Sequence, residues 1–228
     1  YMKLVHYDFS APVEIKNNFL CLAVENRTLF RKYCADLYAQ SQGFDGKFIF
    51  TDGEQRLNFG KSGQIIFDLF SLSLKDKKLT SGLYDCLTSV SDQKYQSEFA
   101  LIVQQICAYL DHMSAECDLP IEYSENYLLS DLLKSAKVNF SENFDSLLEK
   151  VISYIQAIQS FTGVKILVFV NIRGYFDDAE FAELLKHIAY SDISVVCFET
   201  AQPQRVGDEK ILIIDNDMCE ILVGSENS

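Results

Sequence analysis

Short apolar runs that alternate with helix-like segments are the feature of this sequence that most constrains its fold. FLCLAV (19–24), KILVFV (165–170) and ISVVCFE (193–199) are almost continuously apolar, which is typical of strands buried on both faces. Amphipathic segments follow two of these runs, RTLFRKYCADLYAQ after Asn26 and DDAEFAELLKHIAY from Asp177. Strands that alternate with helices predict an α/β fold with a mostly parallel, doubly wound sheet.

A long helical stretch interrupts this alternation. Between 71 and 137 the pattern favours helices, at LTSGLYDCLTSV, at 93–115 and at 125–136, and a further helix is expected at 143–161. The sequence therefore predicts an α/β domain made of 1–70 and 138–228, with a helical domain of 71–137 inserted into it. We expect the polar tail after residue 202 to be partly mobile apart from ILIID. Further strands are expected at KLVHYDF (3–9), KFIF (47–50), IIFDLF (65–70) and KILIID (210–215).

The composition excludes several classes of protein. With 228 residues, of which 48% are hydrophobic and 23% charged, the chain can bury a large core. No apolar run approaches the ~20 residues that a membrane helix needs, and the start lacks a signal-peptide pattern. The seven cysteines contain no C-x-x-C pair and mostly lie in apolar runs. We therefore expect a reduced, cytoplasmic protein without membrane contact.

The net charge of −13 is unevenly distributed along the chain. Residues 1–82 have a balance of +2, whereas the remainder has a balance of −15. No lysine or arginine occurs between Lys94 and Lys134. Such an acidic run is either solvated or holds a hard cation such as calcium, which prefers oxygen ligands. Seven carboxylates lie in it: Glu98, Asp111, Glu116, Asp118, Glu122, Glu125 and Asp131.

FGKSG (59–63) matches only the end of a phosphate-binding loop. That motif needs a glycine five residues before Gly60, and the position holds Gln55. Gly53 comes two residues too early, and the following IIFDLF looks extended rather than helical. A connecting turn or hairpin is the favoured interpretation.

Asn171 stands at the end of a buried strand, where a nucleotide hydrolase would present an aspartate to magnesium. Its amide carries no charge and would be a poor magnesium ligand. Asp177 and Asp178 fit a helix N-terminus better than a catalytic site. The three histidines are scattered, and no Ser or Cys has a base at motif spacing. We therefore expect no enzymatic activity.

Three stretches carry a family resemblance. The region 164–199 is similar to the signature region of the Csn-two family, the small accessory proteins of type II-A CRISPR adaptation. An apolar strand ending in F-V-N, an acid-capped helix and a second strand ending in an aromatic residue plus Glu fall in register. The residues concerned are Phe169, Val170, Asn171, Glu180, Ile188, Phe198 and Glu199. ECDL (116–119) with LLKSAKV (132–138), and IIFDLFSLSLKDKKLTSGLYDCL (65–87), agree as well.

The resemblance implies an ATPase-like head that has lost its nucleotide site, with an inserted helical leg. It also implies a ring-shaped homotetramer that binds the ends of double-stranded DNA through a lysine-lined hole. Calcium would order the head–leg junction. The partners would be the CRISPR integrase complex and the RNA-guided nuclease, during spacer acquisition. One departure concerns the DNA-facing charge, because relatives often carry several lysines before the F-V-N strand and FTGVKIL has only Lys165.

Two sets of residues follow as candidate sites. The calcium ligands are expected among Glu116, Asp118, Glu122 and Glu125, with simple solvation as the alternative. The DNA-contacting lysines are expected to be Lys61, Lys75, Lys77, Lys78, Lys134 and Lys137, which a symmetric tetramer would multiply by four. No reader of base edges is apparent, so binding should be independent of sequence. The alternatives are a nucleotide-binding, kinase- or ATPase-like enzyme and an acidic, protein-binding adaptor.

Overall fold

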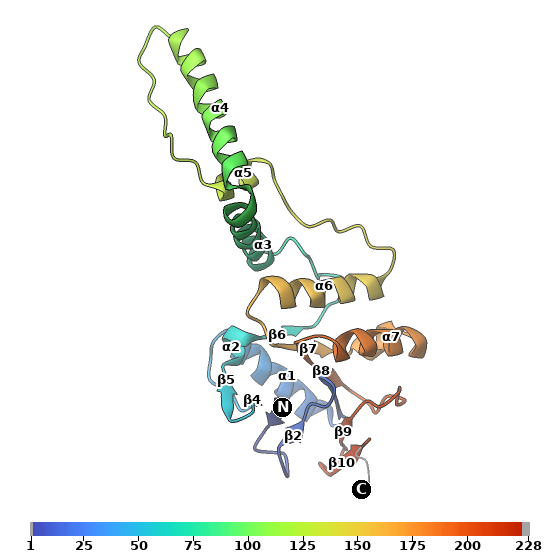
Figure 1. Cartoon of the computed structure of the whole chain (residues 1–228). Helices are drawn as coiled ribbons and strands as arrows, with labels where there is room; N and C mark the ends of the chain where they lie inside the picture. Colours follow the sequence, from blue (N-terminus) through green and yellow to red (C-terminus); the bar gives the residue numbers. More distant parts are fainter. Residues whose placement is uncertain (1, 225–228) are drawn as a thin grey trace. The chain divides into compact units, whose positions relative to one another are not determined.

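The apolar runs lie side by side in one six-stranded sheet (Figure 1). In this computed structural model, which describes residues 2–224, the strand order is β10-β9-β3-β8-β7-β6. Strands β9, β3, β8, β7 and β6 are parallel, and the edge strand β10 runs antiparallel to β9. The predicted mixed α/β class is confirmed. The strands are β3 (Phe19–Val24), β6 (Gly63–Ile66), β7 (Ile166–Val170), β8 (Ser194–Glu199), β9 (Ile211–Ile214) and β10 (Glu220–Val223).

The three central strands are buried along their whole length because both faces of the sheet are covered. On one face, Leu20, Leu22 and Val24 of β3 belong to a core shared with helix α1 (Arg27–Ser41) and a second sheet. On the other face, Phe19 packs edge-on against Phe181 of α7 (Asp178–Ala189), with ring centroids 5.8 Å apart. Helix α6 (Leu147–Phe161) packs on α7.

The second sheet is antiparallel and has the order β2-β1-β4-β5. Leu4 and Phe50 face each other in its central pair and are fully buried in the shared core. Gly53, with φ of 59°, supplies the left-handed turn between the last two strands. The sequence predicted strands at 3–9 and 47–50 but not that they pair with each other. The strands are β1 (Met2–Val5), β2 (Val13–Glu14), β4 (Ile49–Asp52) and β5 (Gln55–Leu57).

Side-chain caps define where the helices of the sheet layers begin. The Asn26 side chain accepts the N–H groups of Thr28 at 3.1 Å and Leu29 at 3.0 Å, which starts α1. Asp177 accepts the N–H of Glu180 at 2.8 Å, and the Glu180 carboxylate accepts the N–H of Asp177 at 3.1 Å. This capping box makes Asp177 the N-cap of α7, the role predicted for it.

The chain divides into two compact units. The α/β unit comprises the described residues up to Ser73 and from Asn143 onward, and the helical unit is Leu74–Glu142. The expected boundaries were 70/71 and 137/138. No helix within residues 2–224 is both long and apolar enough to cross a membrane.

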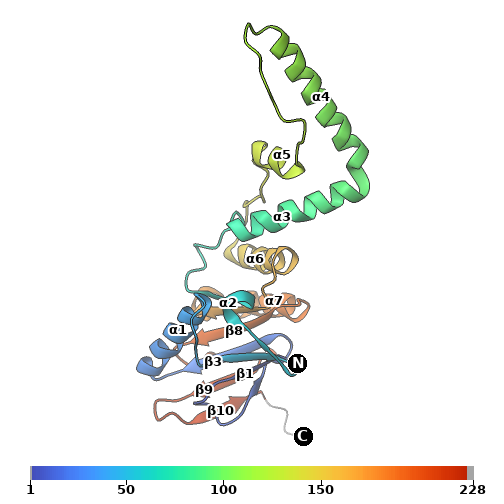
Figure 2. The same cartoon turned by 90° about the vertical axis from the view of Figure 1, so that its left-hand side faces the viewer.

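The helical unit contains three α-helices: α3 (Lys77–Val90), α4 (Gln96–Ala115) and α5 (Leu129–Ser135). A π-helical turn at Ser91–Tyr95 joins α3 to α4, and Figure 2 shows the two helices meeting there at an angle. After α4 the chain returns along that helix in an extended segment, residues 116–128 (Figure 1). The sequence predicted that a helix would begin at 125, but α5 begins only at Leu129.

Candidate functional site

The carboxyl ends of the parallel strands are the first place to search for a nucleotide site. In open parallel sheets, ligands bind at this edge, and phosphates bind where a glycine-rich loop leads from a strand into a helix. The connection from β3 to α1 has that setting. It consists of Glu25 and Asn26 only and contains no glycine.

Backbone N–H groups at the start of α1 already have a hydrogen-bond acceptor within the chain. Asn26 takes the N–H groups of Thr28 and Leu29, which a bound phosphate would otherwise use. The open hollow beside it is lined by Glu25, whose carboxylate would repel a phosphate, and by Arg27, whose guanidinium would attract one. The β3–α1 connection itself has no glycine-rich phosphate loop.

FGKSG lies at the opposite edge of the sheet. Its residues Phe59–Ser62 form the one-turn helix α2, which ends directly at Gly63, the first residue of β6. The Ser62 carbonyl accepts the N–H of Lys165, which lies just before the amino end of β7. Lys61 is exposed beside the amino ends of these strands. A phosphate loop would lie at the carboxyl ends instead, so the segment is a connecting turn.

Asn171 is a turn residue. It has the left-handed φ of 57°, a conformation that asparagine adopts more readily than most residues. Its N–H donates to the Phe198 carbonyl at 2.7 Å, which extends the β7–β8 pairing by one residue. The chain then enters a 3-10 turn, Ile172–Tyr175, whose first N–H groups need acceptors.

Glu199, at the carboxyl end of β8, supplies that acceptor. Its carboxylate accepts the N–H of Arg173 at 3.1 Å and also bonds to the backbone of Ile172. Burial raises the pKa of this carboxyl to about 7, against the opposing effect of these N–H groups and the Arg173 charge. The F-V-N and F-E ends of the signature region therefore meet as one structural unit.

Arg173 ties this turn to the crossover segment that precedes β9. Its guanidinium lies 3.9 Å from the ring centroid of Phe181 and pairs with the buried Glu209 at 3.4 Å. It also donates to the Gln204 carbonyl. Residues 204–209, which we expected in a partly mobile tail, are thus bonded to the sheet layer. Burial raises the pKa of Glu209 as well.

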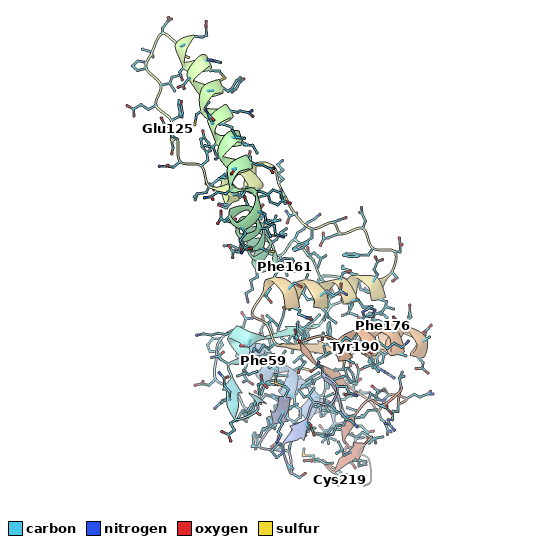
Figure 3. All side chains as sticks on the ribbon, viewed as in Figure 1. Phe59, Glu125, Phe161, Phe176, Tyr190 and Cys219 are labelled. Atoms are coloured by element: carbon cyan, nitrogen blue, oxygen red, sulfur yellow. The ribbon has the colours of Figure 1, made fainter. Side chains whose placement is uncertain are left out.

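The acidic residues proposed for calcium do not come together. Glu116 is the C-cap of α4, whereas Asp118, Glu122 and Glu125 are exposed along the segment 116–128 (Figure 3 labels Glu125). Residues 2–224 contain no group of three or more His, Cys, Asp or Glu side chains placed to hold a metal ion. The arrangement shown does not fit a preformed calcium site, and calcium binding stays a prediction.

Tyr123 holds the same segment against α4. Its hydroxyl donates to Asp111 at 2.5 Å and lies 3.3 Å from the Cys107 carbonyl, both on α4. The hydrogen bond to Asp111, followed by desolvation, raises the pKa of Tyr123 to about 12. Asp111, like Asp131 beside Lys134, is therefore an acidic residue of the run that another side chain engages, and no sequence pattern singled it out.

Five of the six candidate DNA-contacting lysines lie in the helical unit. Lys77 and Lys78 form the first turn of α3, and Lys137 follows α5 in the left-handed conformation, with φ of 53°. Thr80 Oγ1 bonds to Asn139 Oδ1 at 3.0 Å, and the Tyr84 hydroxyl donates to the Val138 carbonyl at 3.1 Å. These bonds place the end of α5 beside the first two turns of α3.

Two of these lysines are partly neutralised. Lys75 pairs with Glu142 at 3.4 Å, and Lys134 pairs with Asp131 at 3.0 Å. All six lysines are exposed. The structure thus brings Lys77, Lys78 and Lys137 to one end of the helical unit, while Lys61 belongs to the α/β unit.

The comparison with known proteins decides the family. Residues 40–218, well over half of the chain, match the family of the CRISPR-associated protein Csn2. The chain belongs to this family. A curated relative, the CRISPR-associated protein Csn2 of Streptococcus agalactiae, is 23% identical over 207 residues, which cover 89% of this chain and 90% of the relative. The resemblance recognised in the sequence is therefore confirmed.

A solved structure supports the same fold. The crystal structure of Stu0660 of Streptococcus thermophilus is similar with a TM-score of 0.60 and 15% sequence identity. The similarity covers 93% of this chain and 75% of that chain. At this identity the likeness shows that this chain and Stu0660 share a fold.

Proposed function

We propose that this Csn2-family protein acts in the spacer-acquisition step of CRISPR adaptation as a non-enzymatic, sequence-independent binder of double-stranded DNA ends. It works in the cytoplasm as a homotetrameric ring, together with the CRISPR integrase complex and the RNA-guided nuclease. Family membership supports the link to CRISPR. The observation that supports DNA binding is the group of exposed lysines in the helical unit, Lys77, Lys78 and Lys137.

The placement of Lys77 and Lys78 supports a role outside helix stability. Cations in the first turn of a helix oppose its dipole, so these two residues cost α3 stability. Asp76 is the N-cap of α3 and offsets part of that cost. The bonded end of α5 adds Lys137 to the same region. A phosphate backbone is the natural partner of such a group of exposed ammonium groups.

Helix α4 supports self-assembly because it has two apolar sides. One side, with Val103 and Ile106, is partly covered by the chain's own segment 116–128. The other side carries Leu101, Ile102, Tyr109 and Met113, which share roughly a third of the helix circumference. Leu101 is 59% and Tyr109 64% exposed, and α4 has no buried residue.

Exposed apolar residues gathered on one side of a helix mark a protein-interaction surface. A second copy of the same chain is the partner we assign to the exposed side of α4. Symmetric assembly also explains how a chain of charge −13 binds DNA, because each lysine is repeated around the shared axis.

The α/β unit provides the scaffold of the proposed ring. Its parallel sheet is ATPase-like, but the β3–α1 connection has no glycine and Asn171 replaces a magnesium-binding carboxylate. We therefore propose no nucleotide chemistry. Calcium remains a proposed ligand of the acidic segment, and no step of DNA binding depends on it here.

The test compares linear duplex DNA with a covalently closed circle of the same sequence in a gel-shift titration. A ring loads only at an end, so linear DNA should be bound and the closed circle should not. Affinity should fall steeply with salt, because each neutralised phosphate releases counterions. Joint replacement of Lys77, Lys78 and Lys137 by Ala should flatten the salt dependence.

Two outcomes would contradict the proposal. Equal binding to closed circles would exclude loading at ends. No DNA binding with or without calcium would favour the acidic, protein-binding adaptor, which the balance of −15 after residue 82 would then explain. The matched control is joint replacement of Lys3, Lys16 and Lys186, which lie in the α/β unit and should leave DNA binding unchanged.

A further inference from the structure

A polar hollow of about 330 Å³ lies in the α/β unit, away from the carboxyl edge of the main sheet. Three separate segments line it: the turn after α1, strand β5 and the start of α2. Its volume is near the lower end of the range of about 300–1,000 Å³ for small-molecule sites. A hollow of this size suits one planar ring system with its attached sugar. The lining residues are Gln40, Gly43, Phe44, Asp45, Gly46, Phe48, Arg56, Leu57, Asn58, Phe59 and Gly60.

The Gln40 side chain forms the floor of the hollow and is held in place by two hydrogen bonds to the Phe48 backbone. Gln40 is buried, donates to the Phe48 carbonyl at 2.9 Å and accepts the Phe48 N–H at 3.2 Å. A side chain at Gly46 would overlap Gln40, with a Cβ 2.1 Å from its Cγ. A Cβ at Gly60 would lie 2.9 Å from the Gln40 carbonyl oxygen. These two glycines therefore let the turn after α1 and the start of α2 pack closely against Gln40.

The rim carries an aromatic ring and a planar cation. Phe44 is 71% exposed, and its ring has no aromatic neighbour within residues 2–224. The Arg56 guanidinium is exposed and makes no hydrogen bond or ion pair in the described part of the chain. Lys61, which follows the lining residue Gly60, adds a second positive charge, while Asp45 places one negative charge on the lining.

This combination matches the chemistry of a single nucleotide. Unpaired bases stack on aromatic rings and on guanidinium planes, and the stacking tolerates any base. Phosphate binds arginine and lysine through charge-assisted hydrogen bonds. A protein that binds DNA ends without sequence preference meets such nucleotides wherever an end is frayed or has an overhang.

We infer that this hollow holds one unpaired nucleotide at a DNA end, with the base against Phe44 and Arg56 and the phosphate near Arg56 and Lys61. The inference rests on the proposed function, because it names the part of the DNA that the α/β unit takes. It assigns a role to FGKSG that differs from a phosphate loop, since the segment forms one wall of a nucleotide hollow.

The experiment measures fluorescence anisotropy of the full chain with three duplexes of equal length and sequence. One duplex has blunt ends, one carries a short single-stranded thymidine extension, and one carries an abasic extension of the same length. The thymidine extension should tighten binding by on the order of tenfold, the usual worth of one stacked base. The abasic extension should bind as the blunt duplex does, apart from a small gain from its phosphates. Extensions on the 3′ and the 5′ strand are measured separately.

Phe44→Ala and Arg56→Gln should each abolish the gain from the thymidine extension and leave blunt-duplex affinity unchanged. The matched controls are Tyr190→Ala, an aromatic residue 91% exposed at the end of α7 (Figure 3), and Arg31→Gln on α1. Both controls should keep the gain.

The inference is overturned if wild-type protein binds the three duplexes equally, or if Phe44→Ala keeps the preference for the extension. Equal binding to blunt and extended duplexes leaves the proposed function intact. If the wild-type chain binds none of the three duplexes, the proposed function is overturned, and this inference with it. Circular dichroism of each variant establishes that a lost preference does not reflect a lost fold.

Discussion

Glu199 lies at the end of the fully buried strand β8. Its carboxyl group bonds to the backbone N–H groups of Ile172 and Arg173, which begin the turn after β7. In a catalytic α/β protein, a carboxylate at this edge would face a ligand. Here the carboxyl group faces the backbone of Ile172 and Arg173. The left-handed Asn171 makes that geometry possible. Two polar residues that resemble the remains of a nucleotide site thus fix the connection between strand and helix.

Glu199 should make stability depend on pH in an unusual direction. The folded chain raises the pKa of this carboxyl from 4.5 to about 7, so the native state holds its proton more tightly than the unfolded chain does. Its contribution to stability is present below pH 4.5 and is lost as pH rises toward 7, by about 3 kcal/mol in the free energy of unfolding. Glu199→Gln keeps an acceptor and removes the titration.

Urea unfolding of both proteins across pH 5 to 8 measures this effect. The two should have similar unfolding free energies at the acid end. Above pH 7 the variant should be the more stable protein by about 2–3 kcal/mol. A difference that stays constant with pH would show that Glu199 is not held in its protonated form.

Purified protein should neither bind ATP tightly nor hydrolyse it. The reason lies at the β3–α1 connection, where Glu25 and Asn26 stand in place of a glycine loop, and at Asn171. Nucleotide binding is measured by calorimetry and turnover by phosphate release. Turnover above background that Lys61→Ala abolishes would restore the enzymatic interpretation of FGKSG.

At the scale of elements, the central strands were predictable because burial on both faces permits almost only apolar residues. This is why FLCLAV, ILVFV and SVVCFE stand out in the sequence. The small antiparallel sheet was predictable only as separate strands. Its pairing of Leu4 with Phe50 depends on chain segments that are far apart in sequence.

The sequence pattern did not predict where the helices of the helical unit begin. A helix was predicted at 93–115, and α4 begins at Gln96 because the π-helical turn Ser91–Tyr95 takes up the first three of those residues. Tyr123 fixes an extended segment where a helix was expected to begin at 125, and one hydrogen bond to a distant helix is not visible in a sequence pattern.

The candidate sites likewise contain residues that could be predicted from the sequence and residues that could not. Lysines are visible as residue types, so the basic group of the helical unit could be anticipated in part. The hollow at Phe44 could not be anticipated, because Phe44, Arg56 and Gly60 meet from three separate segments.

The calcium prediction concerns the segment between α4 and α5. Its carboxylates lie apart in the structure, so an ion would have to draw the extended chain together. We expect calorimetric titration to detect calcium uptake by the wild-type chain. Glu116→Gln combined with Asp118→Asn should abolish it, whereas Glu54→Gln in the other unit should not. Absence of uptake, or uptake unchanged in the double variant, would leave the acidic run as a solvated surface.

At the scale of the whole molecule, the proposed assembly and the proposed DNA binding depend on the same inserted unit. Leu101→Glu combined with Tyr109→Glu places two charges on the exposed apolar side of α4. The variant should sediment at a lower mass than the tetramer proposed for the wild-type chain, because charged residues are costly in an apolar interface. It should also lose the distinction between linear and circular DNA.

The matched control for this variant is Ile221→Glu on the edge strand β10, where the isoleucine is 50% exposed. This control should keep the wild-type mass in analytical ultracentrifugation. A tetramer that persists in the α4 variant would contradict the assignment of α4 as the interface between copies.

The helical unit leaves and rejoins the α/β unit at two points that lie next to each other. The Leu74 N–H donates to the Glu142 carboxylate at 2.7 Å, and Lys75 pairs with the same side chain at 3.4 Å. The first and last residues of the helical unit are thus bonded to each other. Evolution can therefore lengthen, shorten or exchange everything between them without altering the strand order of the sheet. If the proposed ring forms, changes in this inserted unit alone would change the width of its hole.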